Sequence, residues 1–361
     1  MKRILIIHVL GLWYEGMTTV IYNYCSMMDH EGLQFDFLSP NPVPTELKEK
    51  FSLIGKVIEV PNRKKRLLDY CMSLSKLLKR NKYDVVHIHG NSGTMCIESV
   101  IAKKQNVNRV IVHCHNTVCN HPFFNKLMRP IMLSKADCLL SCSQDAGKWL
   151  YGKSGYHVLN NAIDTEKFRF NGKTRMRIRE ELKINDEFVL GHVGHFTEQK
   201  NHTFLLDLFA EIVKEIPNTK LLLVGDGPEL ENISKKVSSL GLQKTVIFAG
   251  KTENPENMYF AMDMFLFPSK WEGLGLVLIE AQASGLQCIT SNNVPREGNI
   301  TGNVNFINYN YIEKWKNYII NYVNSEKEHR SITSDKNIVK IRQYNYDIRA
   351  ESYKLKKIYN G

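Results

Sequence analysis

No stretch of this 361-residue chain approaches the roughly 18 consecutive apolar residues that a membrane-spanning helix requires. The sequence also has no low-complexity tract and no repeat of solenoid period, and its eight cysteines lack the paired spacings of a zinc site. These absences argue against an integral membrane protein, a repeat protein and a disulfide framework. We expect reduced, buried thiols and a cytoplasmic location.

The first ten residues superficially resemble a targeting segment. Lys2 and Arg3 precede an apolar run, but His8 and Gly11 interrupt it and no small-residue cleavage site follows. This segment is therefore predicted to be a buried β-strand. The length of the chain and its composition, 43% hydrophobic and 24% charged, suit a globular protein of two domains, each of about 150 to 200 residues.

Positive charge is concentrated in the N-terminal half. The net charge is +11, and residues 1–160 contain 21 Lys and Arg against 12 Asp and Glu. The densest basic patch consists of residues 63–66, Lys76, Lys79, Arg80 and Lys82. Such a patch could bind nucleic acid, contact an anionic membrane surface or be a solvated face. Nucleic acid is disfavoured because no base-stacking aromatic residues or recognised motif accompany the charges.

Short apolar runs alternate with amphipathic segments along the whole chain. Strands are predicted at residues 4–9, 35–38, 57–60, 85–89, 110–115, 138–142, 157–159, 188–193, 221–224, 246–249, 264–267, 288–290 and 304–307. Helical periodicity is clearest at residues 18–28, 67–80 and 123–134. The alternation predicts α/β domains in which helices cover both faces of parallel sheets.

Residues 267–285 form the segment around which the chain is organised. An apolar strand ends at Pro268, a loop with Glu272, Gly273 and Gly275 follows, and a helical run continues to Gly285. With the next apolar run this is a βαβ unit whose loop lies at the carboxyl edge of the sheet, where α/β proteins place ligands. Amides at the start of the helix favour an anion such as a phosphate.

Two carboxylates flank this anion site. Glu272 lies in the loop, and Glu280 can reach back toward it because helical side chains lean toward the N-terminus. Both can accept hydrogen bonds from hydroxyl groups, so the layout suits a sugar nucleotide. The alternative is an ordinary packed helix with both glutamates merely solvated.

This segment resembles the signature of retaining glycosyltransferase family 4. Two glutamates separated by seven residues lie between Pro-Ser and Ala-x-Ala-Ser-Gly. The resemblance covers nearly the whole chain. It implies the GT-B fold, in which two Rossmann-like parallel-sheet domains face a central cleft. The implied domains are residues 1–165, which bind the acceptor, and residues 166–342, which bind the nucleotide sugar. A C-terminal helix at residues 343–361 is expected to pack back on the first domain.

The resemblance also implies roles for residues of the second domain. Glu272 would bind hydroxyl groups of the donor sugar and Glu280 those of the ribose. Lys200 and the backbone around the helix start would stabilise the leaving diphosphate. Where the family commonly has an arginine this chain has His195, which cannot form a bidentate guanidinium contact. The implied donor site comprises His195, Lys200, Glu272, Gly273, Leu274, Gly275, Leu276 and Glu280, together with Gly16 of the first domain.

Gly16 is the one match to a Gly-Gly pair of the family, and a plain turn is the alternative there. His115 resembles the histidine of the family's His-x-His-Asn segment and would orient the donor sugar, which makes His115, Lys200 and Glu272 the expected catalytic residues. The pairs His87/His89 and His113/His115 could each chelate a metal. No third ligand is evident and the two strands need not place the pairs together, so no metal site is predicted.

The resemblance implies a hexosyltransferase that needs neither metal nor cofactor. It would transfer a sugar with retention, a UDP-sugar being favoured, to a lipid-linked or other saccharide acceptor in bacterial capsular or exopolysaccharide synthesis. Peripheral contact with the inner face of the cell membrane is expected, and nucleic acid is not. Two alternatives stay open: a sugar-nucleotide 2-epimerase of the same fold, and a non-catalytic protein that binds membranes or nucleic acid through its charge.

Overall fold

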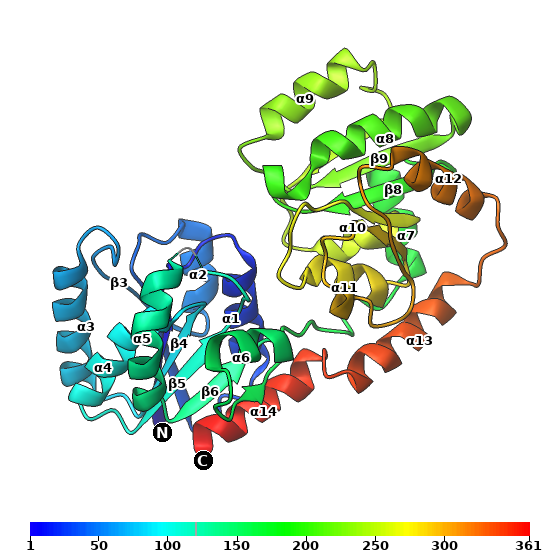
Figure 1. The fold of residues 1–361 in the computed structure, drawn as a ribbon. Helices are drawn as coiled ribbons and strands as arrows, with labels where there is room; N and C mark the ends of the chain where they lie inside the picture. The colour runs from blue at the N-terminus through cyan, green and yellow to red at the C-terminus, as the bar shows by residue number, and fades with distance from the viewer. Residues whose placement is uncertain (120) are drawn as a thin grey trace. The chain divides into compact units, whose positions relative to one another are not determined.

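The computed structural model describes residues 1–119 and 121–361, which form two compact units (Figure 1). The first unit contains Met1–Ala162 and Ile348–Gly361, and the second contains Ile163–Asp347. The boundary thus falls three residues before the predicted one. The C-terminal segment of the first unit begins at Ile348, because residues 343–347 belong to the second unit.

The first unit is built on a seven-stranded parallel sheet. Its strands are β1 (Lys2–His8), β2 (Leu33–Ser39), β3 (Gly55–Glu59), β4 (Val85–Gly90), β5 (Arg109–Cys114), β6 (Cys138–Ser141) and β7 (His157–Val158). Their order is β3-β2-β1-β4-β5-β6-β7. The order reverses between β1 and β4, so ligands of such a sheet are expected beyond the carboxyl ends of these two strands.

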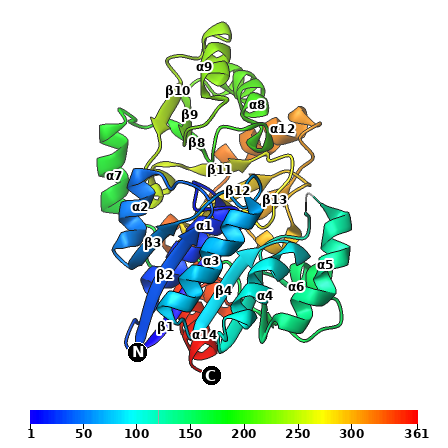
Figure 2. The ribbon, with the colours of Figure 1, turned by 90° about the vertical axis from the view of Figure 1, so that its left-hand side faces the viewer.

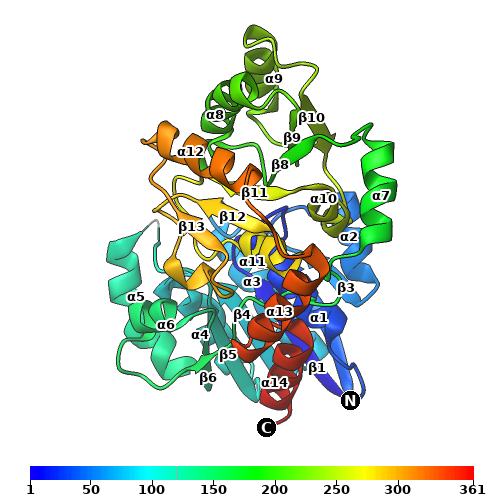
Figure 3. The same ribbon diagram turned by 90° about the vertical axis from the view of Figure 1, so that its right-hand side faces the viewer.

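Helices cover both faces of this sheet. They are α1 (Gly16–Met27), α2 (Thr45–Ser52), α3 (Leu67–Asn81), α4 (Cys96–Lys104), α5 (Pro122–Lys135), α6 (Gln144–Tyr151) and α14 (Ile348–Asn360). One buried cluster joins the sheet to α3, α4, α5 and α6, with Leu74, Ala102, Met132 and Leu150 at its contacts. Helices α3 and α4 lie in front of the strands in Figure 2, and α1 and α14 lie side by side in Figure 3.

The second unit repeats this architecture with six parallel strands. They are β8 (Phe188–Val193), β9 (Thr219–Val224), β10 (Val246–Gly250), β11 (Met264–Phe267), β12 (Gln287–Thr290) and β13 (Val304–Phe306). Their order is β10-β9-β8-β11-β12-β13, which reverses between β8 and β11. The prediction of two Rossmann-like parallel sheets is confirmed.

Two apolar clusters enclose the second sheet. The helices are α7 (Gly172–Glu181), α8 (His202–Glu215), α9 (Leu230–Ser239), α10 (Pro255–Ala261), α11 (Leu276–Ala283), α12 (Ile312–Val323) and α13 (Arg330–Gln343). Leu205, Ile233 and Trp315 bring α8, α9 and α12 into one cluster. Ile178, Tyr259, Leu278 and Ile338 bring α7, α10, α11 and α13 into the other. No helix in the described part of the chain is both long and apolar enough to cross a lipid bilayer.

Candidate functional site

An ion pair occupies the reversal point of the second sheet. Lys200 closes a short 3-10 helix after β8, Glu272 lies in the loop after β11, and Lys200 Nζ stands 2.6 Å from Glu272 Oε1. Both side chains are largely buried, with 16% and 8% of their surfaces exposed. The ammonium group also lies 4.9 Å from the centre of the Phe267 ring. The structure thus brings together two predicted site residues that are 72 positions apart.

Backbone and amide hydrogen bonds hold the loops after β8 and β11 together. The amide of Lys270 donates to the carbonyl oxygen of Gln199 at 2.8 Å, and Gln199 Nε2 donates to the carbonyl oxygen of Trp271 at 2.9 Å. Asn201 Nδ2 donates to the carbonyl oxygen of Pro268 at 3.3 Å. These bonds fix the loops from which Lys200 and Glu272 project.

Two glycines in the Glu272 loop have different structural demands. Gly275 begins α11 with a φ of +78°, and a Cβ there would lie 2.8 Å from the Phe267 ring. Gly273 has no atom within 4 Å of the place that a Cβ would take. The side chain of Leu274 is buried in the core, so only its backbone can face a ligand. Gly275 is therefore required by the fold, whereas Gly273 leaves open space in front of α11.

Glu280 lies one turn into α11 and is bound by a tyrosine. Tyr259 donates its hydroxyl hydrogen to Glu280 Oε2 at 2.8 Å. Burial raises the pKa of Glu280 to about 7, although the hydrogen bond from Tyr259 and the positive charge of Lys167 lower it. The sequence analysis missed Tyr259, since nothing in the pattern of α10 distinguishes it from a core residue.

His195 lies on the same edge of the sheet, half exposed, with Nδ1 at 3.3 Å from Asp226 Oδ1. The loop that carries Asp226 packs closely on the His195 loop: the amide of Phe196 donates to the carbonyl oxygen of Asp226 at 2.6 Å. A Cβ on Gly225 would lie 2.1 Å from the carbonyl oxygen of Gly194. Asp226 is thus a further charged residue at this edge to which the sequence analysis assigned no role.

In the first unit, Gly16 begins α1 directly after the loop that follows β1. The preceding residue, Glu15, places Oε1 2.8 Å from Nε2 of the buried His8. A Cβ on Gly16 would meet nothing within 4 Å. The fold therefore does not itself require glycine at this position, which leaves the helix start accessible to a ligand.

The four histidines of the two predicted pairs lie together on one face of the first sheet, an arrangement that the sequence left open. The register places His89 of β4 opposite His113 of β5, and the rings of His113 and His115 lie 4.1 Å apart. His89 Nδ1 is 2.8 Å from His115 Nε2. Burial lowers the pKa of His87 and of His115 to about 3, so both rings are neutral near pH 7.

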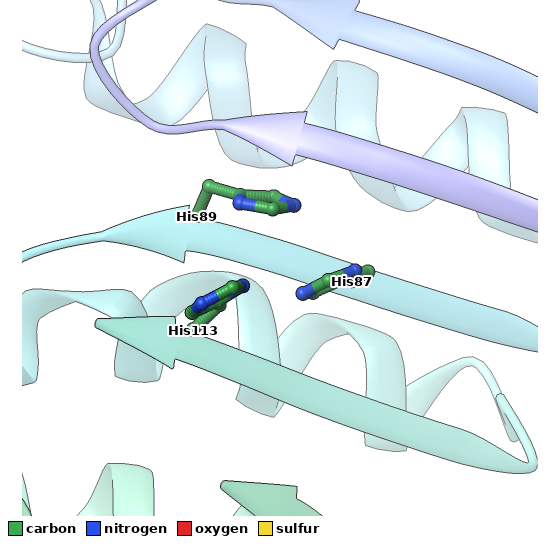
Figure 4. A group of neighbouring side chains, drawn as sticks. All are labelled: His87, His89 and His113. Carbon is green, nitrogen blue, oxygen red and sulfur yellow. The ribbon is translucent and has the colours of Figure 1, made fainter. Parts of the chain in front are cut away.

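One ring nitrogen from each of His87, His89 and His113 lies within 4.8 Å of the corresponding nitrogens of the other two (Figure 4). A third nitrogen donor, which the sequence did not reveal, therefore lies beside each predicted pair, because parallel pairing of β4 and β5 brings the two pairs together. The prediction that the chain holds no metal site stays a prediction.

The basic patch of the first unit is smaller than the sequence suggested. Arg63 is not part of a solvated face: its Nε donates to Glu98 Oε1 at 2.6 Å, and 12% of its side chain is exposed. The hydroxyl of Tyr70 donates to the same carboxylate at 2.9 Å. Arg63 therefore belongs to a buried polar network, while Lys64, Lys65 and the basic residues of α3 remain exposed.

A hollow of about 890 Å³ lies at the opposite edge of the second sheet. It borders Phe188 and Asp263, which stand at or just before the amino ends of β8 and β11. Arg175 Nη2 donates to Asp263 Oδ1 at 2.6 Å there. Because ligands of open parallel sheets bind at the carboxyl edge, this hollow is not the candidate donor site.

Two protein-family models match the chain in succession. The model described as "Glycosyltransferase Family 4" matches residues 14–167, and that described as "Glycosyl transferases group 1" matches residues 174–337. The putative glycosyltransferase EpsF of Bacillus subtilis (strain 168) is 34% identical over 309 residues, covering 81% of this chain and 80% of EpsF.

A second relative and a solved structure extend the comparison. The Escherichia coli UDP-Gal:alpha-D-GlcNAc-diphosphoundecaprenol alpha-1,3-galactosyltransferase is 31% identical over 242 residues, which cover 61% of each chain. The crystal structure of Anabaena HepE in complex with UDP and glucose matches with a TM-score of 0.79 at 15% identity, over 99% of both chains. That structural match concerns the fold.

Proposed function

Because the chain belongs to the glycosyltransferases, with a family 4 region followed by a group 1 region in a GT-B fold, we propose that it transfers a sugar from a UDP-sugar to a saccharide acceptor. The observation that carries the proposal is the buried Lys200–Glu272 pair at the reversal point of the second sheet, beside the first turn of α11. A cation and a helix N-terminus stabilise a diphosphate, and a carboxylate accepts hydrogen bonds from sugar hydroxyls.

The proposed reaction proceeds with retention of the anomeric configuration. The bond between the anomeric carbon and the diphosphate oxygen breaks, the acceptor oxygen bonds to that carbon on the same face, and the leaving diphosphate takes the acceptor proton. Protein groups then act by positioning and by stabilising negative charge on the leaving group. The proposed transfer needs no metal ion or cofactor at the donor site.

Donor binding would exchange partners within the ion pair. The diphosphate would take the ammonium group of Lys200, and a sugar hydroxyl would donate to the freed carboxylate of Glu272. The amides of Gly273, Leu274, Gly275 and Leu276 would face the phosphates, with His195 as a hydrogen-bonding group beside them. Glu280 would accept from the ribose hydroxyls, and Gly16 and His115 are proposed as donor contacts on the first unit.

A lipid-linked sugar is the proposed acceptor, in bacterial capsular or exopolysaccharide synthesis. In support, the Escherichia coli relative is named for transfer to a GlcNAc carried on diphosphoundecaprenol. UDP as the donor nucleotide is supported by that relative's name and by the UDP complex of HepE.

Helix α5 is proposed as the membrane contact of this acceptor-binding unit. Phe123, Phe124, Leu127 and Ile131 are exposed on it, with Phe123 exposing 73% of its surface. Lys126 and Lys135 are exposed on the same helix. An exposed apolar face with basic neighbours is typical of a helix that lies in the interface of an anionic membrane. This adds a specific surface to the sequence-based prediction, which rested on the family resemblance together with the basic patch.

The test is UDP release from UDP-sugars with and without an undecaprenyl-diphosphate-linked sugar. We expect release that requires the acceptor and a product with retained anomeric configuration. Lys200→Ala and Glu272→Gln should each lower kcat/KM by about 10² or more, because Lys200 would stabilise the leaving diphosphate and Glu272 would bind the transferred sugar. Conversion of the UDP-sugar without acceptor would instead indicate an epimerase, and no turnover of any UDP-sugar would contradict the proposal.

A further inference from the structure

The histidine cluster of the first unit is built by strand register. His87 and His89 are two residues apart on β4 and share a face, and His113 lies opposite His89 on β5. Their exposed fractions are 0%, 4% and 1%. Tyr359 of α14 reaches this cluster from the helix that covers the same face. One nitrogen of each ring therefore lies close to the other two inside the core (Figure 4).

The cluster leaves ring nitrogens without a protein partner. Among the described residues, Nε2 of His87, Nε2 of His89 and both nitrogens of His113 make no hydrogen bond despite being buried. Each buried polar atom without a partner costs about 1–3 kcal/mol. Native proteins satisfy nearly all such atoms, with an ion or a bound water where no protein group is available. Several unpaired nitrogens at one place point to a common occupant.

In His87 and His89 the hydrogen bond to a protein group is made by Nδ1, and Nε2 stays available for a metal ion. His87 Nδ1 lies 2.7 Å from the hydroxyl oxygen of Tyr359, and His89 Nδ1 lies 2.8 Å from His115 Nε2. If each Nδ1 carries the hydrogen and donates it, each Nε2 presents a lone pair. Metal-binding histidines have this arrangement, in which a hydrogen bond at the other nitrogen fixes the tautomer and the ring orientation.

We propose that His87, His89 and His113 bind one transition-metal ion, of which Zn²⁺ is the best fit, as a structural site within the first unit. Three neutral imidazoles suit Zn²⁺ rather than Mg²⁺ or Ca²⁺, which prefer oxygen ligands. Zn–N bonds of about 2.0–2.1 Å place ligand nitrogens about 3.4 Å apart. One nitrogen of each ring now lies within 4.8 Å of the other two. Movements of the ring nitrogens by up to about 1 Å, through side-chain rotation, would bring the three nitrogens to the spacing of zinc ligands.

The proposed ion does not contact the donor itself, although its ligand His89 lies beside His115, a proposed donor contact of the first unit. It would hold His89 so that His89 Nδ1 donates to His115 Nε2, which leaves the hydrogen of His115 on Nδ1. The metal therefore sets the tautomer of a proposed donor contact without touching the donor.

The test is metal analysis of the full-length protein, purified with a histidine-free tag and without chelators from zinc-supplemented medium. We expect about one Zn²⁺ per chain in the wild type and less than about 0.1 in His113→Leu. The matched control is His202→Leu, because His202 is likewise buried with both ring nitrogens unpartnered. It should keep its metal. Protein produced with Co²⁺ should show the visible absorption of a four-coordinate site, in which a water molecule completes the three imidazole ligands.

Tyr359→Phe keeps the aromatic ring and removes only the hydroxyl that orients His87. It should bind Zn²⁺ about 10- to 100-fold more weakly in a chelator competition. This variant keeps the proposal testable if His113→Leu does not fold. Wild-type protein without metal, full metal content in His113→Leu, equal loss in His202→Leu, or unchanged affinity in Tyr359→Phe would each overturn the proposal.

Discussion

At the residue scale, substitution of the two glycines of the Glu272 loop should distinguish a loss of ligand binding from a loss of stability. Gly273→Ala adds a methyl group to open space, so the free energy of unfolding should change by less than about 0.5 kcal/mol. If the diphosphate approaches this backbone, kcat/KM for the UDP-sugar should fall at least about tenfold. Gly275→Ala should instead destabilise the protein by about 1–3 kcal/mol, because of its positive φ and the Phe267 ring. Denaturant unfolding and steady-state kinetics on both variants provide the check.

Full activity of Gly273→Ala with intact stability would show that no ligand passes close to this residue. Gly275→Ala, at a residue whose amide is also a proposed phosphate contact, should lose stability as well as activity, so the unfolding curve distinguishes it from Gly273→Ala.

Glu280 makes stability depend on pH. Its pKa is about 7 in the folded protein against 4.5 for an ordinary glutamate, so the folded state binds more protons between these values. The free energy of unfolding should therefore fall as the pH rises from about 4.5 to about 7. Glu280→Gln cannot take up this proton. The Tm of the variant minus the Tm of the wild type should therefore be larger at pH 8 than at pH 5. A Tm difference that is the same at both pH values would contradict the assignment.

The sequence predicted which side chains meet where a motif places them after neighbouring strands. It did not predict contacts that depend on tertiary packing or on strand register. The proximity of Lys200 and Glu272 follows from their places after β8 and β11, the strands at which the order reverses. The burial of Arg63 against Glu98 could not be predicted, because the sequence shows a basic run and not the carboxylate 35 residues away. The meeting of His89 and His113 depends on the register of two strands, which periodicity does not determine.

At the element scale, helix α5 gives the membrane proposal a specific test. Phe124→Ser combined with Leu127→Ser should weaken binding to vesicles that contain anionic lipid by about tenfold or more, because two exposed apolar side chains lose their burial. Ile332→Ser combined with Val339→Ser is the matched control on α13, where both residues are exposed. Vesicle co-sedimentation measures both. Equal binding of the two double variants would place the contact elsewhere.

The strands were predictable because both faces of each sheet are covered, so their residues form apolar runs bounded by turn residues. Predicted and observed ends differ by a few residues: β9 begins at Thr219, two residues before the expected start, and β5 ends at Cys114, which leaves His115 in the following loop. The order of the strands in each sheet could be given only by resemblance, since apolar runs carry no pairing information.

At the scale of the whole molecule, the chain leaves the first unit after Ala162 and returns at Ile348. Both crossing segments are anchored inside the second unit, where Ile163 and Asp347 form a parallel bridge and Thr165 donates to the Asp347 carboxylate. The sequence analysis placed the return at residue 343. It could not locate Asp347, because this anchoring depends on side-chain contacts with residues about 180 positions earlier.

The most direct test of the central claim is calorimetric titration of UDP into the full-length protein. We expect saturable binding to the wild type and at least about tenfold weaker binding to Lys200→Ala, since a hydrogen bond to a charged group contributes about 1.5–3 kcal/mol. Lys220→Ala is the matched control, because Lys220 is equally buried and pairs with Glu187 at 3.0 Å, at the amino edge of the same sheet. Its UDP affinity should match the wild type within about twofold. Absence of UDP binding to the wild type, or equal loss in both lysine variants, would contradict a donor site built on Lys200 and Glu272.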